Sequence, residues 1–309
     1  MRRPGNRIIK SFIRYPESDY LCAAMPQESH PTFTLKAILR LTRFWNLFVI
    51  GMAQYFAAIF LIDTHLLLDW KLFVLASSTA MIAGAGYIIN DYYDIKIDLI
   101  NKPERVVIGK NIARRYALLF HSVLSFSGVA FGFLLGWKLG LIHIFSSFIL
   151  WWYSNSLKRQ PLVGNLMIAL LTGLSITLIN IVYDLSNSFV IIFSLFAFFI
   201  TLVREIVKDM EDLKGDNTFG CKTLPIIWGI RKTKVLVYFL LALFSLLVIL
   251  LNAVYSQMPF SYFLVFLFAP LGLFLFGLMQ ADTKRDFYTL SQWCKLIMVL
   301  GIISMVFMN

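Results

Sequence analysis

Two short stretches of this sequence concentrate carboxylates, and each follows directly on a long apolar run. In the first stretch, Asp91, Asp94 and Asp98 recur at intervals of three and four residues. If the preceding helix continues through the stretch, this spacing places the three carboxylates on one face. Asn90 lies beside that face, where its amide oxygen can join them as a ligand.

The second acidic stretch has a similar pattern. Its acids again lie at intervals of three and four residues, which predicts one helical stripe. They are Glu205, Asp209, Asp212 and Asp216. Lys208 lies within the stretch, where a cation must face a partner or a polar cavity.

Carboxylates at these spacings repel one another and destabilise a helix, so each stretch requires a compensating partner. A single stretch of this kind is equally consistent with a solvated face whose charges pair with local Lys and Arg residues. Two such stretches, both at the ends of apolar runs, favour a binding site instead. Mg²⁺ prefers oxygen ligands and is usually held by one or two carboxylates together with substrate phosphates. The pattern therefore predicts a site for magnesium and a diphosphate.

Basic residues near the acidic stretches suit the same ligand, because Lys and Arg bind phosphate oxygens. Their alternative role is only to orient the chain in a membrane. The candidates are Arg105, Lys158, Arg159, Arg204, Lys208 and Lys222.

The elements that position these residues are apolar helices. Of the 309 residues, 59% are hydrophobic and 15% are charged, against about 25% charged in ordinary soluble domains. A soluble fold cannot hide that much apolar surface, so lipid must cover part of it. The net charge of +11 would suggest nucleic acid in a soluble protein, but here the cations lie between apolar runs, and no nucleic-acid partner is expected. The three dispersed cysteines indicate neither a disulfide framework nor a zinc site.

The fold class predicted is an all-α, multi-pass membrane bundle. Residues 1–33 lack the apolar core of a signal peptide and are expected to form a poorly ordered basic extension. Residues 34–309 are expected to form the membrane domain, with nine spans of roughly the required length. These are Phe44–Ile62, Leu72–Ile89, Tyr116–Leu135, Leu141–Tyr153, Leu162–Val182, Phe189–Val203, Val235–Val254, Phe260–Met279 and Trp293–Met308.

The distribution of Lys and Arg predicts the orientation of the bundle. If the nine spans alternate, nearly all the cations fall in the N-terminal segment and in the even-numbered loops. The opposite loops carry only Lys138, with Lys71 at a boundary. The positive-inside rule then places the N-terminus and both acidic stretches in the cytoplasm and the C-terminus outside. The membrane expected is the plasma membrane.

These motifs resemble those of the UbiA superfamily of intramembrane prenyltransferases. The sequence NDYYDIKID at Asn90–Asp98 matches the NDxxDxxxD motif of the family, and Asp212-x-x-x-Asp216 matches its DxxxD motif. The segments Ile100–Lys110, Tyr153–Arg159 and Cys221–Gly229 also resemble conserved stretches of the family. Nine spans is the architecture of the family. RVVIGK at Arg105–Lys110 departs from it, since a proline-containing stretch is expected there.

The resemblance implies magnesium-dependent transfer of a prenyl group from a prenyl diphosphate to a lipophilic acceptor. The metal ligands that it implies are Asn90, Asp91, Asp94, Asp98, Asp209, Asp212 and Asp216. The catalytic residues expected are Asp91, Asp94, Asp212 and Lys208. Asn46 matches a polar position near the diphosphate, and it completes the diphosphate-binding set with Asn90, Arg105, Lys158, Arg159, Arg204 and Lys222.

The acceptor is less constrained by the sequence. The run REIVKDMEDLKGD at Arg204–Asp216 looks most like the branch of the family that prenylates geranylgeranylglyceryl phosphate in ether-lipid synthesis. The alternative within the family is an aromatic acceptor of quinone synthesis. A transporter is the non-enzyme alternative, since intramembrane acids mark ion pathways. The DGxxAR signature of CDP-alcohol phosphotransferases is absent. No protein partner is predicted.

Overall fold

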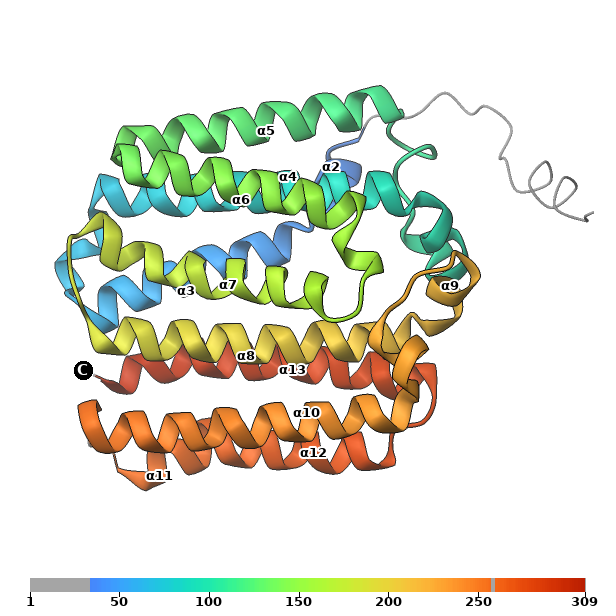
Figure 1. Cartoon of the computed structure of the whole chain (residues 1–309). Coiled ribbons are helices and arrows are strands. Elements are labelled where there is room, and N and C mark those ends of the chain that lie inside the picture. Colours follow the sequence, from blue (N-terminus) through green and yellow to red (C-terminus); the bar gives the residue numbers. More distant parts are fainter. Residues whose placement is uncertain (1–33, 257–258, 309) are drawn as a thin grey trace, which may run out of the picture.

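The computed structural model describes residues 34–256 and 259–308. The basic extension expected at residues 1–33 lies outside the described residues. Where the structure describes the chain, its regular elements are helices, apart from one isolated bridge between Ile108 and Ile112. The long helices lie side by side along one direction (Figure 1). This confirms the all-α, multi-pass bundle.

The long helices match the predicted spans closely, with extensions at several ends. They are α3 (Phe44–Leu61), α4 (Trp70–Asn101), α5 (Arg114–Leu135), α6 (Trp137–Asn155), α7 (Val163–Val182), α8 (Ser188–Glu211), α10 (Leu224–Leu251), α12 (Ala269–Gln280) and α13 (Lys284–Ser304). Short helices precede or join them: α2 (Leu35–Leu41), α9 (Leu213–Thr218) and α11 (Phe260–Phe263). A π-helical segment, Leu264–Phe268, makes α11 and α12 one continuous span.

Eight of the helices in the described part of the chain are long and apolar enough to cross a membrane, whereas the sequence predicted nine spans. The difference is α6, the fourth and shortest predicted span. Polar residues such as Lys138 and His143 lower its hydropathy, although its 19 residues lie against α4, α5 and α7 within the bundle. His143 is buried there, with its Nε2 atom 2.8 Å from the hydroxyl oxygen of Ser78 on α4.

Helix α4 continues well beyond its apolar run, as the first acidic stretch requires. It spans 32 residues, and the Asp69 side chain caps its first turn by accepting a hydrogen bond from the Lys71 amide at 2.9 Å. Asp91, Asp94 and Asp98 therefore lie on one helix, as predicted.

The single stripe predicted for the second acidic stretch is wrong. Helix α8 ends at Glu211, Asp212 is its C-cap, and Asp216 lies on the separate helix α9. The chain turns at Asp212 because the following residues bind the end of α4 rather than continuing α8. The break changes which acids can meet.

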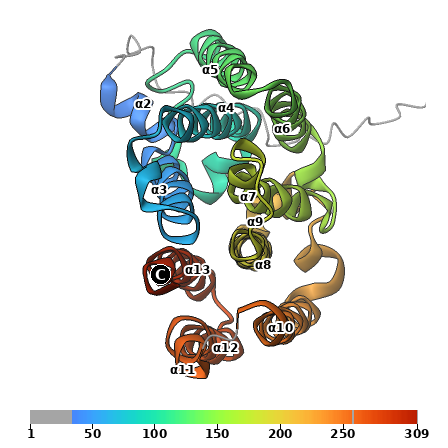
Figure 2. The same ribbon diagram turned by 90° about the vertical axis from the view of Figure 1, so that its left-hand side faces the viewer.

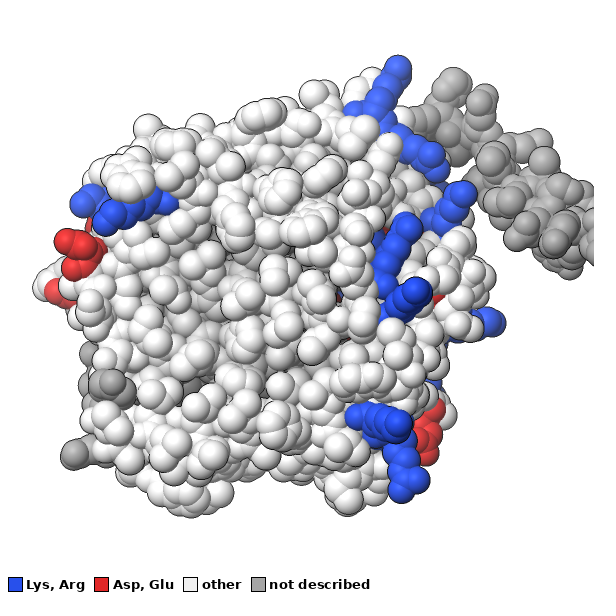
Figure 3. Space-filling model, viewed as in Figure 1, with Lys and Arg blue, Asp and Glu red and all other residues white. Residues whose placement is uncertain are grey.

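The helices form a bundle around a central region bordered by α3, α4, α7, α8 and α13, with α10 and α12 packed outside α8 and α13 (Figure 2). Close contacts between helices depend on small residues. A Cβ atom added to Gly86 would lie 2.9 Å from the Leu150 side chain of α6, and one added to Gly173 would lie 2.9 Å from the Ser194 carbonyl oxygen of α8. On the face shown in Figure 3, Lys and Arg gather mainly at the end of the bundle that carries α9, and the surface between the two ends is almost free of charge.

Candidate active site

The two acidic segments meet where the last turn of α4 contacts α9. The Asn101 side chain joins them: its Nδ2 atom donates to the Asp212 carbonyl oxygen at 3.2 Å, and its Oδ1 atom accepts from the Gly215 amide at 3.0 Å. A Cβ atom at Gly215 would lie 2.4 Å from Asn101 side-chain atoms, so the Asn101 side chain would have to shift and give up these hydrogen bonds. Asn101 thus holds Asp212 and α9 against α4. No spacing pattern in the sequence indicates this role.

Lys102 is a second site residue that the sequence analysis did not single out. Its ammonium group lies 2.8 Å from an Asp212 carboxylate oxygen and 3.1 Å from one of Glu211. Burial would lower the pKa of Lys102, but the charges of Asp212 and Glu211 outweigh it and raise that pKa. Lys102, which follows the first acidic stretch in the chain, therefore binds two acids of the second stretch, Glu211 and Asp212.

The carboxylates of α4 also have basic partners. Lys158, in a short 3₁₀ helix (Leu157–Arg159), forms an ion pair with Asp94, and its Nζ atom lies 3.4 Å from the Asn90 amide oxygen. Arg43 lies immediately before α3, and its guanidinium is 2.7 Å from an Asp91 oxygen and 4.8 Å from the centre of the Tyr87 ring. The structure thus brings both Lys158 and Arg43 to the acids of α4, and the diphosphate contact expected of Lys158 stays a prediction.

Further carboxylates, those of Asp98, Asp212 and Asp216, lie close enough to Asp94 or to one another for their charges to repel. Burial, followed by repulsion from Asp212 and Asp94, raises the pKa of Asp216 to about 7. One carboxylate oxygen of Asp212, Oδ1, is buried and has no hydrogen-bond partner in the described part of the structure. Both observations describe carboxylates that a cation would stabilise.

Magnesium fits this donor set. Within the described residues, no three His, Cys, Asp or Glu side chains converge closely enough to hold a metal ion unaided. Magnesium does not need such a group, because it takes one or two carboxylates and completes its shell with water and substrate phosphates. The free oxygen of Asp212 and the carboxylates and amide of α4 are hard oxygen donors of the type it prefers.

The remaining acids of α8 have other partners. Asp209 accepts a hydrogen bond from the Asn165 side chain of α7 at 2.8 Å. Glu205 is buried and pairs with Arg204 at 2.5 Å and with Lys208 at 3.0 Å. Arg204 and Lys208 therefore contact Glu205 rather than the carboxylates of Asp94 or Asp212.

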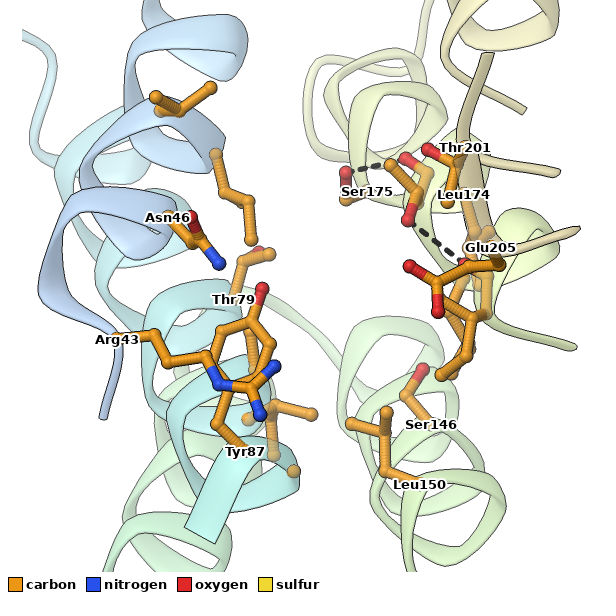
Figure 4. A pocket seen from close by; sticks show the side chains of 18 of the residues that line it. Arg43, Asn46, Thr79, Tyr87, Ser146, Leu150, Leu174, Ser175, Thr201 and Glu205 are labelled. Carbon is orange, nitrogen blue, oxygen red and sulfur yellow. Dashed lines mark hydrogen bonds between the residues drawn. The ribbon is translucent and has the colours of Figure 1, made fainter. Parts of the chain in front are cut away.

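A cavity of about 250 Å³ opens among α3, α4, α6, α7, α8 and α13. Asn90, which lines the cavity, is the neighbour of Asp91 in the chain. Lys208 also lines it and lies one helical turn before Asp212. The cavity therefore begins beside the acidic segments. Arg43, Asn46 and Tyr87 lie on one wall and Glu205 on the facing wall (Figure 4).

Beyond this polar entrance the cavity is lined largely by apolar side chains. They include Ile50, Ile82, Leu171, Leu174, Met298 and Val299. Buried Gln54 lies beyond them and donates to the Thr79 hydroxyl at 3.1 Å and to the Ser175 carbonyl oxygen at 2.7 Å. Thr79 and Ser175 themselves line the cavity. An ionic entrance with an apolar interior matches a lipid that has an ionic head.

Three predicted diphosphate ligands lie at the surface. Arg105 is exposed, 3.9 Å from the carboxylate of Glu104. Arg159 and Lys222 are also exposed and meet through the backbone, where the Lys222 amide donates to the Arg159 carbonyl oxygen at 2.8 Å. Their diphosphate contacts stay predictions.

The bundle and its site define an integral membrane protein whose cavity has an ionic entrance and a largely apolar interior. The model of the UbiA prenyltransferase family matches residues 51–297, and the chain belongs to this family. It is therefore a prenyltransferase, as its motifs predicted.

The chain is similar to digeranylgeranylglyceryl phosphate synthases. It is 32% identical over 274 residues to that of Saccharolobus solfataricus, covering 88% of this chain and 96% of the relative. It is also 32% identical over 236 residues to the synthase of Methanosphaera stadtmanae, and this match covers 75% of this chain and 85% of the relative.

Solved structures share the fold. One, described as a digeranylgeranylglyceryl phosphate synthase in membranes, matches with a TM-score of 0.67 at 24% identity, covering 88% of this chain and 97% of the other. A UbiA homologue from Archaeoglobus fulgidus bound to GPP and Mg²⁺ matches with a TM-score of 0.63 at 17% identity. The match covers 87% of this chain and 99% of the homologue.

Neutralising Asp216 is expected to stabilise the metal-free protein. The pKa of this carboxyl rises from 3.8 to about 7 on folding, so its ionisation lowers folding stability as the pH rises through that range. In EDTA at pH 8, Asp216→Asn should therefore melt at a higher temperature than the wild type, and the difference should vanish near pH 4. Added Mg²⁺ should raise the melting temperature of the wild type more than that of the variant. A variant that melts lower than the wild type at pH 8 would contradict this electrostatic account.

Proposed function

We propose that this chain transfers a geranylgeranyl group from its diphosphate to the hydroxyl of geranylgeranylglyceryl phosphate, with Mg²⁺ as cofactor, in ether-lipid synthesis. The observation that carries the proposal is the meeting of two carboxylate segments at the entrance of an apolar cavity. The names of the similar relatives support the acceptor. The related structure with GPP and Mg²⁺ supports the donor class and the metal.

Magnesium would be held by residues of both acidic segments. These are Asn90, Asp91, Asp94, Asp98, Asp212 and Asp216, with Asp209 contributing only if it releases Asn165. Bound there, Mg²⁺ would supply positive charge that offsets the charge developing on the departing diphosphate. Lys102 and Lys158 add fixed positive charge on the two sides of the same site.

The chain itself supplies position and shielding in this reaction. Asn90 and Lys158, beside the acidic segments, orient the diphosphate, and the apolar wall takes the hydrocarbon tail out of water. The allylic C–O bond breaks with its electrons leaving on diphosphate, and the acceptor hydroxyl forms the new ether bond and releases its proton. Excluding water from the cavity prevents hydrolysis of the prenyl group.

The cation-rich end of the bundle is proposed to face the cytoplasm, because the positive-inside rule places Lys and Arg there. The active site then opens to the cytoplasm and the C-terminus lies outside, with the plasma membrane as the proposed location. Substrates made in the cytoplasm would reach such a site directly.

The test is a transfer assay with the purified protein in lipid, Mg²⁺ and geranylgeranyl diphosphate. Geranylgeranylglyceryl phosphate and a hydroxybenzoic or dihydroxynaphthoic acid would be offered separately. The expected result is an ether product from the glyceryl phosphate and no prenylated aromatic product. A prenylated aromatic product alone would assign the chain to quinone synthesis instead.

Chelation should abolish this transfer reversibly. EDTA is expected to reduce product formation to background, because the carboxylates then repel the diphosphate. Excess Mg²⁺ should restore the original rate in the same sample. Transfer that persists in EDTA would contradict a metal-dependent site.

A further inference from the structure

A second ionic group lies in the polar entrance of the cavity, farther along α8 toward the membrane than Asp212. Arg204, Glu205 and Lys208 of α8 and Lys295 of α13 all line the cavity. Along α8, Lys208 and Arg204 precede Asp212 by about 6 and 12 Å, at about 1.5 Å per residue. The group therefore lies along the cavity wall on the membrane side of the site proposed for the diphosphate.

This group has more positive than negative charge. Glu205 is its one carboxylate, and it pairs with both Arg204 and Lys208. The Nε atom of Arg204 is buried and has no hydrogen-bond partner in the described structure. With Lys295 the group holds three cations and one carboxylate, a formal charge of +2.

Lys295 is the most unusual member. It is half-buried in the middle of α13, and no ion pair or hydrogen bond of its side chain is found among the described residues. Arg204, Glu205 and Lys208 line the same cavity, and Glu205 already pairs with both cations of α8. An ammonium group inside a membrane bundle is expensive unless a counter-charge reaches it, so such residues mark binding sites.

We propose that Lys295, together with Arg204 and Lys208, binds the phosphate monoester of the acceptor lipid. A phosphate monoester carries a charge of about −1.5 to −2 at pH 7, which balances the +2 of the group. Its oxygens would accept hydrogen bonds from the Arg204 guanidinium and from the two ammonium groups. The inference rests on the proposed function and separates the roles of the basic residues: Lys102 and Lys158 serve the donor, whereas Arg204, Lys208 and Lys295 serve the acceptor.

This arrangement would select acceptors by their phosphate. If an acceptor alcohol without phosphate bound here, Glu205 would be the one counter-charge for the three cations. Leaving buried charged groups unpaired costs binding energy, so the site would reject the alcohol in favour of the phosphate lipid. It would also keep the two substrates apart, because the donor diphosphate has its own metal-dependent site.

The test is equilibrium binding in EDTA, where the donor site cannot assemble and no turnover occurs. The probes are geranylgeranylglyceryl phosphate and its dephosphorylated alcohol, with the wild type and Lys295→Met. We expect the wild type to bind the phosphate lipid at least about 10-fold more tightly than the alcohol, and Lys295→Met to lose about 10- to 100-fold of that affinity. Lys232→Met, at an exposed lysine near the start of α10, is the matched control and should behave as the wild type.

Kinetics provide a second readout at saturating Mg²⁺. Lys295→Met should raise the KM for the phosphate acceptor and leave the KM for geranylgeranyl diphosphate unchanged, while Lys295→Arg should retain most of the acceptor affinity. An equal rise in the donor KM would assign Lys295 to the donor and overturn the proposal. Equal binding of phosphate lipid and alcohol by the wild type would also overturn it, and that comparison needs no variant to fold. Failure of the proposed function would appear separately, as wild-type protein that binds the phosphate lipid in EDTA but forms no ether product.

Discussion

Replacing Asp212 with asparagine is expected to lower prenyl transfer by about 10²- to 10³-fold, the loss typical when one preorganised electrostatic contact to a developing charge is removed. The Oδ1 atom of Asp212 is buried without a hydrogen-bond partner, and Oδ2 lies 2.8 Å from the Lys102 ammonium. Asparagine keeps the size of the side chain and one oxygen for Lys102. It removes the negative charge and one of the two oxygens that a metal would use.

Activity and stability must be measured together for this variant. The rate is taken at saturating geranylgeranyl diphosphate and Mg²⁺, and the melting temperature in EDTA should stay near that of the wild type. The matched control is Asp282→Asn, because Asp282 also pairs with a lysine, Lys234 at 3.3 Å, but is 84% exposed and lies outside the site. Wild-type turnover by Asp212→Asn would remove Asp212 from the metal-binding set.

Gly215→Ala is expected to destabilise the protein by about 2–4 kcal/mol, from overpacking and the loss of two hydrogen bonds. The new Cβ atom would lie 2.4 Å from Asn101, and Asn101 could no longer bind both the Gly215 amide and the Asp212 carbonyl oxygen. Asp212 would move relative to α4, so transfer should fall as well. Thermal unfolding and the transfer rate are the two measurements.

Two further variants isolate the contact. Gly272→Ala is the matched control, because nothing lies within 4 Å of a Cβ atom at that helical position and the substitution should be neutral or stabilising. In an Asn101→Ala background, the space for the new methyl group is already free. The cost of Gly215→Ala should therefore shrink there by about 0.5–3 kcal/mol, and strictly additive effects would contradict the contact.

The local pattern of the sequence determined the helices and their chemistry. Apolar runs of spanning length predicted the bundle, because each run depends only on its own residues. The spacing of Asp91, Asp94 and Asp98 predicted one acidic face for the same reason, and α4 carries it. The matching motif at Asp212 and Asp216 identified the family before any contact was known.

Only the tertiary structure decided which residues meet. Asn101, Lys102 and Arg43 join segments far apart in the chain, and no spacing pattern in the sequence indicates which partners they contact. Interhelical contacts also break the predicted stripe at Asp212 and point Lys295 into the cavity. Helices that are apolar all round can face a neighbour in many rotations. Their pairing is therefore set by side-chain packing and by ion pairs across the bundle, and neither can be read from one segment at a time.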